Sequence, residues 1–311
     1  MKTFILRLVV LTAGVAGLLP WMARGADAQV IELWPEGVPG LRADAAPEIV
    51  KDDRVYAVHT PTLTSFPVPG NIANGTAVIM CPGGAYSRLA VSTEGMGAVK
   101  WLNGLGVHVF ILKYRMKEYG QPAPLRDVLR AVRLVRSRAA EWGIDPSRIG
   151  VAGSSAGGHL AACAGTLFNE EVGKTGSPLD GVSARPDFLI LQYPVVTMKP
   201  PFAHAGSRDN LLGENPSQEL IDFYSVNERV TKETPPTFLM ATQEDKSVPA
   251  DNALSFYQAL RAVGVSAEIH IYPNGPHGFG FRTDLGPTSD WSKRAEEWMR
   301  FRGLLPQESR K

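Results

Sequence analysis

The amino-acid sequence predicts an α/β protein built on a mostly parallel sheet of about eight strands, with helices on both faces. Short apolar runs bounded by turn residues alternate with longer segments of helical periodicity, which is the pattern of repeated βαβ units. The 311 residues are 44% apolar and 20% charged, a composition that supports a packed core and excludes disorder as the main state. Right-handed crossovers between parallel strands then place helices on both faces.

The first elements surround a Pro-Gly-Gly turn. Polar and apolar residues alternate over 54–64, which predicts one strand or two strands that pair with each other. Residues 76–80 read as a buried strand that runs into the turn, and residues 107–112 read as another. Between these strands, residues 93–103 have the pattern of a helix closed by two glycines.

An amphipathic helix is predicted over residues 125–139, where apolar side chains recur at spacings of three and four. The other side of this helix is interpreted as a solvated face, formed by Arg126, Arg130, Arg133 and Arg136. The same criteria predict strands at 148–153, 188–191, 237–240 and 267–272, and helices at 160–167, 250–262 and 291–301.

The N-terminus has the layout of a secretory signal peptide over residues 1–28. Lys2 and Arg7 precede an apolar run over 8–22, and Ala26 and Ala28 supply the small residues of a cleavage site. Glycines and a proline interrupt the run, whereas a membrane-spanning helix needs about 20 consecutive apolar residues. We therefore expect cleavage after Ala28, a periplasmic or secreted protein, and no membrane attachment after cleavage.

Residues 29–311 are expected to form a single domain. The least regular stretch, 195–233, is rich in Pro, Gly, Ser and charge, and we interpret it as an excursion over the carboxyl edge of the sheet or a small lid. Lys and Arg total 32 against 31 acidic residues, and no run of like charges occurs, so no nucleic-acid partner is expected. No feature of the sequence indicates an oligomeric state.

Two cysteines occur in the chain, which excludes a disulfide scaffold and a cysteine-rich zinc protein. Cys81 and Cys163 form either a disulfide, which an oxidising compartment permits, or two buried thiols, and both alternatives stay open. The sequence contains no His-Glu-x-x-His string and no phosphate-binding loop of the Gly-x-x-x-x-Gly-Lys type. We expect neither a metal nor another cofactor.

The segment Gly153-Ser154-Ser155-Ala156-Gly157 fits Gly-x-Ser-x-Gly between a predicted strand and a predicted helix. A nucleophilic serine needs a very sharp strand-to-helix turn, where bulky neighbours would clash, so glycines flank it. The helix N-terminus then favours the negative charge that develops beside the hydroxyl. Ser155 is the predicted nucleophile, and Ser154 is out of register.

A second glycine-bearing loop, Pro82-Gly83-Gly84-Ala85-Tyr86, directly follows the buried strand 76–80. Backbone amides that hold the oxyanion of a tetrahedral intermediate need close approach, which glycine permits. We predict the Ala156 amide as one donor and the Gly84 amide as the other, with Ala85 close behind.

One of the six histidines is predicted to be the general base. His277 alone sits in a loop just past the last strand, where its imidazole can lie over the sheet edge. The alternatives fit the pattern less well: they are His59, His108 and His270 in or near strands, His159 packed one turn after Ser155, and His204 in the excursion.

A carboxylate is needed to fix the tautomer of the base and to stabilise the imidazolium. Asp245 follows the strand 237–240 and precedes a helix, so its side chain also points from the carboxyl edge. Its neighbour Glu244 is the rival candidate and is interpreted as a solvated surface group.

The chain resembles the α/β-hydrolases, and more narrowly the bacterial secreted carbohydrate esterases related to acetylxylan and feruloyl esterases. The resemblance spans nearly the whole mature chain, and the order Ser155, Asp245, His277 matches that of the superfamily. The motifs that carry it are Leu33-Trp34-Pro35-Glu36-Gly37, Pro82-Gly83-Gly84, Asp145-Pro146, Gly153 to Gly158, Asp245 with Val248-Pro249, and His277-Gly278-Phe279.

The chain departs from these relatives at one loop. Many relatives carry histidine before the oxyanion glycines, and Cys81-Pro82 replaces it here. Dienelactone hydrolases, another similar branch, use a cysteine nucleophile, whereas this chain has Ser155.

The resemblance implies a serine carboxylesterase that removes acetyl or feruloyl groups from plant cell-wall carbohydrate, with an acylated carbohydrate or small ester as substrate. Tyr86 and Tyr193 are candidate substrate-binding residues that would stack on a sugar or an aromatic acyl group. The alternatives are a general short-chain carboxylesterase, an exopeptidase of the prolyl-peptidase type, and a non-catalytic binding protein on the same fold.

Overall fold

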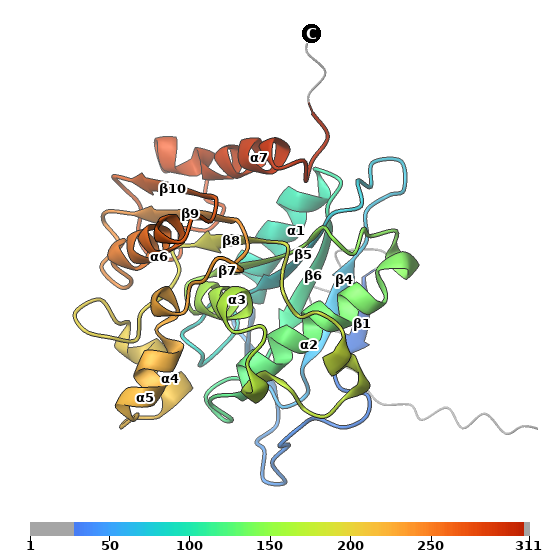
Figure 1. Cartoon of the computed structure of the whole chain (residues 1–311), viewed down its shortest axis with the longest axis vertical. Coiled ribbons are helices and arrows are strands. Elements are labelled where there is room, and N and C mark those ends of the chain that lie inside the picture. The colour runs from blue at the N-terminus through green and yellow to red at the C-terminus, as the bar shows by residue number, and fades with distance from the viewer. Residues whose placement is uncertain (1–27, 308–311) are drawn as a thin grey trace, which may run out of the picture.

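The computed structural model describes residues 28–307, and its centre is an eight-stranded sheet (Figure 1). Across the sheet the strands are β1 (Gln29–Glu32), β4 (Thr62–Phe66), β6 (His108–Lys113), β5 (Ala77–Cys81), β7 (Ile149–Ser154), β8 (Phe188–Gln192), β9 (Thr237–Thr242) and β10 (Ala267–Tyr272). All neighbours from β6 to β10 are parallel, and β4 is antiparallel to both β1 and β6. The predicted fold class is confirmed. The predicted signal peptide, apart from Ala28, lies outside the described residues.

Helices cover both faces of the sheet, as predicted. Figure 1 shows α1 (Met96–Asn103) and α7 (Trp291–Phe301) on one face, where the rings of Trp101 and Trp291 meet with centroids 5.2 Å apart. The other face carries α2 (Ala123–Ser137), α3 (Ala156–Thr166) and α6 (Asp251–Ala262). Within the described residues, no helix is long and apolar enough to cross a membrane.

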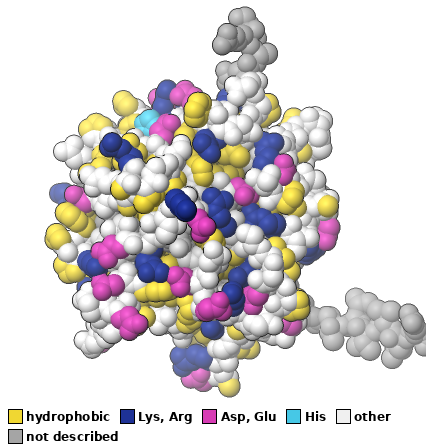
Figure 2. Space-filling model, in the orientation of Figure 1, with side chains coloured by type: hydrophobic (Ala, Val, Ile, Leu, Met, Phe, Trp, Pro, Cys, Tyr) yellow, Lys and Arg dark blue, Asp and Glu magenta, His cyan; other side chains and the backbone are white. Residues whose placement is uncertain are grey.

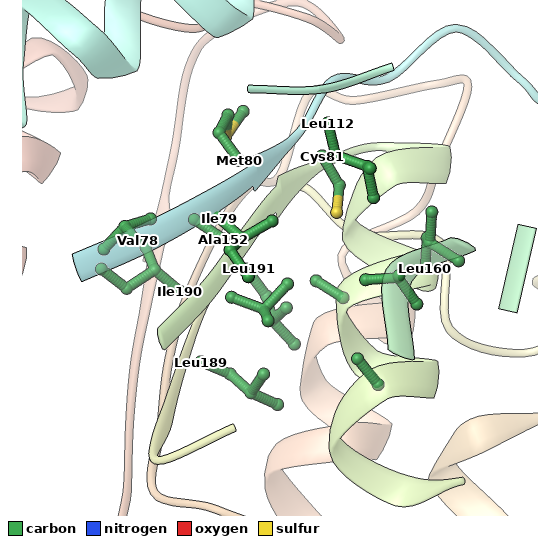
Figure 3. Packing of buried hydrophobic residues seen from close by; sticks show 14 of the residues in the cluster. Val78, Ile79, Met80, Cys81, Leu112, Ala152, Leu160, Leu189, Ile190 and Leu191 are labelled. Atoms are coloured by element: carbon green, nitrogen blue, oxygen red, sulfur yellow. The ribbon is translucent and has the colours of Figure 1, made fainter. Parts of the chain in front are cut away.

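The core lies between the central strands and the helices. Every residue of β5 is buried, and successive side chains point to opposite faces of the sheet. In Figure 3, Cys81 and Leu191 lie on the side of α3, and Val78 and Met80 lie on the opposite side. Because both faces are covered, the parallel strands read as continuous apolar runs instead of alternating patterns.

The arginine side of α2 is not a solvated face, contrary to the sequence interpretation. Arg130 and Arg133 are only 4% and 3% exposed. Arg130 donates to the carbonyl of Leu33, and Arg133 pairs with Asp180 over 3.0 Å. Asp180 belongs to a short 3-10 turn, Pro178–Gly181, that lies over this side of α2. Each guanidinium is buried because backbone carbonyls and carboxylates satisfy its donors.

Residues 54–64 form neither the single strand nor the two mutually paired strands that the sequence predicted. The segment splits into β3 (Arg54–Tyr56), which pairs with β2 (Ile49–Lys51) in a separate two-stranded sheet, and the start of β4, which joins the main sheet. Strand β1 was not predicted either. It is only four residues long and mostly exposed, so it carries no periodic signal.

The excursion at 195–233 contains two short helices, α4 (Ala205–Leu212) and α5 (Gln218–Tyr224), which lie together beyond α3 in Figure 1. Its N-terminal end is tied to α6, because Asn252 accepts hydrogen bonds from the Val196 and Thr197 amides.

Candidate active site

The turn between β7 and α3 holds Ser155 with φ 55° and ψ −121°, a strained conformation for a residue other than glycine. Steric contact explains the flanking glycines. A Cβ on Gly153 would lie 2.1 Å from the carbonyl oxygen of Gly157, and a Cβ on Gly157 would lie 2.1 Å from that of Cys81. Ser154 faces inward with no exposed surface, which leaves Ser155 as the hydroxyl available at the turn.

Three side chains that lie far apart in the sequence meet at the carboxyl edge of the sheet. The Ser155 hydroxyl lies 2.8 Å from His277 Nε2, and His277 Nδ1 lies 2.6 Å from Asp245 Oδ2. Ser155 follows β7, Asp245 follows β9 and His277 follows β10. The Asp245 side chain is 1% exposed and that of His277 is 23% exposed, so the chain of hydrogen bonds runs from the interior towards solvent.

Hydrogen bonds fix the orientation of Asp245. Its Oδ1 accepts from the backbone N–H groups of Ser247 and Val248, both over 2.9 Å, which leaves Oδ2 for His277. A carboxylate has no donor, so the imidazole donates from Nδ1 and its Nε2 accepts the Ser155 hydroxyl proton. The geometry therefore fixes the tautomer that a general base requires.

The rival acid Glu244 is exposed and serves the loop that carries His277. Its carboxylate accepts from the Gly275 N–H over 3.2 Å, and Thr242 donates its hydroxyl to the Gly275 carbonyl over 2.7 Å. The Tyr193 ring meets the His277 ring edge to face with centroids 5.2 Å apart. These contacts hold the imidazole over the turn of Ser155.

The loop after β5 has three consecutive residues with positive φ: Gly84 at 136°, Ala85 at 56° and Tyr86 at 56°. Its carbonyls are held from one side, since the Gly83 carbonyl accepts from the Ala90 N–H over 2.9 Å and the Gly84 carbonyl accepts from the loop itself. Because a trans peptide points C=O and N–H in opposite directions, the Gly84 and Ala85 amides face the other way.

Those amides are available to a ligand. Within the described residues, the N–H groups of Gly84, Ala85 and Ala156 donate no hydrogen bond to the protein. Free amides at a strained loop and at a helix N-terminus are the arrangement that an oxyanion requires.

The structure does not fit the expectation that Tyr86 and Tyr193 offer stacking surfaces. Both residues are only 1% exposed, and stacking on a sugar needs an open ring face. The Tyr86 hydroxyl donates to His159 Nδ1 over 2.8 Å, and His159 Nε2 donates to the Tyr224 carbonyl over 2.8 Å. Burial lowers the pKa of His159 to about 4, so this histidine is a neutral packing residue, as its position on α3 predicted.

Two polar residues near the site, Glu94 and Asn210, could not be identified from the sequence. Glu94 is 7% exposed, and its carboxylate accepts from the Gly83 N–H over 2.6 Å. Asn210 on α4 donates to the Ala85 carbonyl over 2.8 Å. Their partners lie in distant loops, so no spacing in the sequence could have identified them.

His204, at the start of α4, had been grouped with the irregular excursion. Its pKa is lowered by burial and by the proximity of His277, with an opposing effect of Asp245. The excursion therefore places an imidazole near His277 and Asp245.

Within the described structure, Cys81 and Cys163 are two buried free thiols and do not form a disulfide. Burial raises the pKa of each thiol, so neither is a ready nucleophile. No group of three or more His, Cys, Asp or Glu side chains among residues 28–307 could hold a metal ion.

Comparison with protein families places most of the chain in one family. The BD-FAE family matches residues 68–260, which include Ser155 and Asp245. The dienelactone hydrolase family matches residues 221–309, which include Asp245 and His277. The second match begins after the nucleophile position and does not bear on it.

Two curated relatives cover about two thirds of the chain. An acetylxylan esterase from Xylanibacter ruminicola is 37% identical over 214 residues, which are 68% of this chain and 42% of the relative. Endo-1,4-beta-xylanase B from Butyrivibrio fibrisolvens is 34% identical over 211 residues, which are 67% of this chain and 33% of the relative. The chain thus spans less than half the length of either protein.

Solved structures extend the likeness to almost the whole chain. An acetyl ester-xyloside bifunctional hydrolase from Caldicellulosiruptor lactoaceticus is 39% identical with a TM-score of 0.79, over 94% of this chain and 100% of that chain. The carboxylesterase Cest-2923 from Lactobacillus plantarum has a TM-score of 0.67 at 22% identity, which shows the shared fold alone. The chain belongs to the BD-FAE family and has the α/β-hydrolase fold.

Proposed function

We propose that the protein is a serine carboxylesterase that removes short acyl groups from plant cell-wall carbohydrate, with Ser155, His277 and Asp245 as its catalytic triad. The observation that carries the proposal is the continuous hydrogen-bond chain of 2.8 Å and 2.6 Å between these side chains. Its geometry matches the roles of nucleophile, general base and orienting acid.

In the first step, the Ser155 oxygen attacks the ester carbonyl carbon while its proton passes to His277 Nε2. The imidazolium so formed carries its positive charge beside the Asp245 carboxylate, which is 1% exposed and therefore interacts through a medium of low dielectric constant. The carbonyl oxygen becomes an oxyanion, for which the free amides of Gly84, Ala85 and Ala156 are the proposed donors.

Collapse of the tetrahedral intermediate breaks the bond to the alcohol, and His277 Nε2–H protonates the departing oxygen. Water then attacks the acyl-enzyme as its proton passes to the same nitrogen. A second tetrahedral intermediate collapses to release the carboxylic acid, and the proton returns to Ser155. The protein finishes in its starting protonation state without any further reactant.

Support for acylated carbohydrate as the substrate comes from the relatives. Two of the proteins reported above are named for acetyl ester or acetylxylan hydrolysis, and a third is named a xylanase. Acetyl on xylan and feruloyl on arabinose side chains are the two proposed acyl groups. Other relatives carry the names esterase and carboxylesterase, so a general short-chain carboxylesterase is the second candidate.

The activity test compares three substrates side by side: acetylated xylan, methyl ferulate and an aminoacyl-anilide. We expect ester cleavage to exceed anilide cleavage, with acetate released from xylan. Faster anilide cleavage would refute the esterase proposal in favour of the exopeptidase. Hydrolysis of p-nitrophenyl acetate without release of acetate from xylan or of ferulate from methyl ferulate would support the general carboxylesterase instead.

The triad test uses Ser155→Ala and His277→Ala with p-nitrophenyl acetate. Each variant should lose several orders of magnitude in kcat, because the two groups act as one unit. Wild-type turnover in Ser155→Ala would refute the assignment of the nucleophile.

We further propose that the mature protein acts outside the cytoplasm, since residues 1–28 have the layout of a signal peptide. N-terminal sequencing of the exported protein should begin at Gln29. An N-terminus that retains residues 1–28 would refute cleavage.

A further inference from the structure

Glu94 is a buried carboxylate that the proposed mechanism leaves without a role. It is 7% exposed, and among the described residues no Lys or Arg forms a salt bridge with it, although the charge of Arg54 acts on it at longer range. A buried charge without an ionic partner is expensive to retain unless hydrogen bonds satisfy it. Its hydrogen-bond partners therefore indicate what it does.

Each carboxylate oxygen of Glu94 accepts one hydrogen bond. One donor belongs to the loop after β5, and the other belongs to a residue that contacts His277. Oε2 accepts from the Gly83 N–H over 2.6 Å, at the start of the loop after β5 (residues 82–86), which is the proposed oxyanion loop. Oε1 accepts from the Tyr193 hydroxyl over 3.1 Å. The Tyr193 ring in turn contacts the His277 ring edge to face, at 5.2 Å between centroids.

The segment that carries Glu94 forms hydrogen bonds with both the carbonyl and the N–H group of Gly83. Ala90 donates its N–H to the Gly83 carbonyl over 2.9 Å, and Glu94 accepts the Gly83 N–H. Residues Val91–Gly95 form one turn of π-helix, a rare structure that often occurs at functional sites. The sequence pattern had predicted an ordinary helix from residue 93.

Gly83 lies directly against the nucleophile turn. A Cβ on Gly83 would lie 2.6 Å from the Ser154 carbonyl oxygen, 2.9 Å from Glu94 Oε2 and 3.0 Å from the Ser155 Cβ. A small displacement of Gly83 therefore changes the distance between the Ser155 hydroxyl and the amides of the loop that follows.

We propose that Glu94 is a positioning residue that couples the oxyanion loop to the general base, by binding the Gly83 N–H with one oxygen and the Tyr193 hydroxyl with the other. The inference rests on the esterase function proposed above. Glu94 supplies support at the position where Cys81-Pro82 replaces the histidine of many relatives, together with Tyr114, whose hydroxyl donates to the Pro82 carbonyl over 2.6 Å.

The surroundings of Glu94 act on its carboxyl group in opposite directions. Burial raises the pKa of Glu94, while the Gly83 N–H, the Tyr193 hydroxyl and the charges of His277 and Arg54 lower it. Since an amide N–H can only donate, Oε2 must accept in either protonation state.

Three variants separate hydrogen bonding from packing: Glu94→Gln, Glu94→Leu and Tyr193→Phe. Glutamine can keep its oxygen on the Gly83 N–H and donate its amide to the tyrosine oxygen, so Glu94→Gln should keep kcat within about threefold. Glu94→Leu loses both bonds and should lower kcat about 100-fold with KM within about threefold, since a misplacement of about 1 Å can cause a loss of that size. Tyr193→Phe keeps the ring and loses one bond, so its kcat should fall about fivefold to tenfold.

A second readout reports on the oxyanion loop itself. A trifluoromethyl ketone forms a tetrahedral adduct with an active serine, and its affinity for Glu94→Leu should fall in proportion to kcat, not to KM. Glu141→Gln, at an exposed carboxylate paired with Arg138, is the matched control and should behave as wild type.

The proposal is overturned if Glu94→Leu keeps wild-type kcat, or if it raises KM alone. Wild-type kcat in Tyr193→Phe overturns it as well, even where Glu94→Leu does not fold. Ester hydrolysis that depends on Ser155 but is insensitive to these variants refutes the role of Glu94 and leaves the proposed function standing. Absence of Ser155-dependent ester hydrolysis in the wild type refutes both.

Discussion

Replacement of Asp245 by Asn tests the hydrogen-bond chain most directly, because it changes one atom and preserves the shape. The Asp245 Oδ1 accepts two backbone N–H groups, from Ser247 and Val248. Only the oxygen of asparagine can replace that acceptor, so the NH2 group must occupy the Oδ2 position and face His277 Nδ1. The histidine must then accept at Nδ1 and carry its proton on Nε2, where it can no longer accept the Ser155 proton.

The expected loss follows from this reversed tautomer. We expect kcat for p-nitrophenyl acetate to fall about 10⁴-fold, the size seen when a triad aspartate becomes asparagine. That factor corresponds to ~5.4 kcal/mol in the activation free energy. The melting temperature should change by only a few degrees, because the buried shape and the two backbone hydrogen bonds remain.

The assay measures kcat and KM at neutral pH together with calorimetric melting. Asp284→Asn is the matched control, since Asp284 is an exposed carboxylate paired with Arg282, and its kcat should stay within about twofold of wild type. A decrease of less than tenfold in Asp245→Asn would refute the argument that Asp245 fixes the tautomer of His277.

Three further predictions concern stability. Gly157→Ala should destabilise the fold by at least ~3 kcal/mol in urea unfolding, because its Cβ would lie 2.1 Å from a backbone oxygen of β5. Gly181→Ala is the control: its Cβ would have open space around it, and the same measurement should show a loss of less than ~1 kcal/mol. Tyr86→Phe leaves His159 Nδ1 without its donor, and we expect a loss of ~1–3 kcal/mol in the same measurement, with an unchanged midpoint refuting the bond. Burial lowers the pKa of His108 and His159 from 6.5 to about 4, so the unfolded state binds more protons than the folded state in this pH range. The free energy of unfolding should therefore fall by roughly 2 kcal/mol per histidine as the pH drops from about 6.5 to 4. His108→Gln should make this pH dependence of stability shallower, and an unchanged slope would contradict the prediction.

The central part of the fold could be predicted because its signal is local. Residues 76–80 and 148–153 are continuous apolar runs next to glycine-rich turns, and they form β5 and β7 within one residue of the prediction. The peripheral strands could not be found in this way. Strands β1 and β2 are short and exposed, so neither carries a hydrophobic period. Pairing holds them instead: β1 pairs with β4, which is distant in the sequence, and β2 forms a hairpin with β3.

The sequence predicts some residues of the candidate site better than others, for the same reason. Ser155, Asp245 and His277 each follow a recognisable strand, so their position at one edge is implied by a parallel sheet. The position of a residue after a strand does not imply how far it is buried from solvent. Tyr86 and Tyr193 were expected to be accessible to a substrate, and both are buried. Strand ends place a side chain along the sheet but do not fix how much protein covers it.

The surroundings of the site depend on contacts across the fold. The excursion reaches the loop after β5 through Asn210, and the arginines of α2 are covered by a later segment. Surface charge is mixed, and Figure 2 shows basic and acidic side chains interspersed over the face in view. Neither feature follows from the periodicity of a single element.

The position of β10 at the rim of the sheet has a consequence for thermal inactivation. This strand pairs with β9 alone and is partly exposed along its length, whereas β7 is buried and paired on both sides. Local opening should therefore begin at β10, and it would carry the following loop with His277 away from Ser155 while the centre stays folded. Heating should abolish turnover below the temperature at which circular dichroism changes, and amide hydrogen exchange should be faster in β10 than in β7.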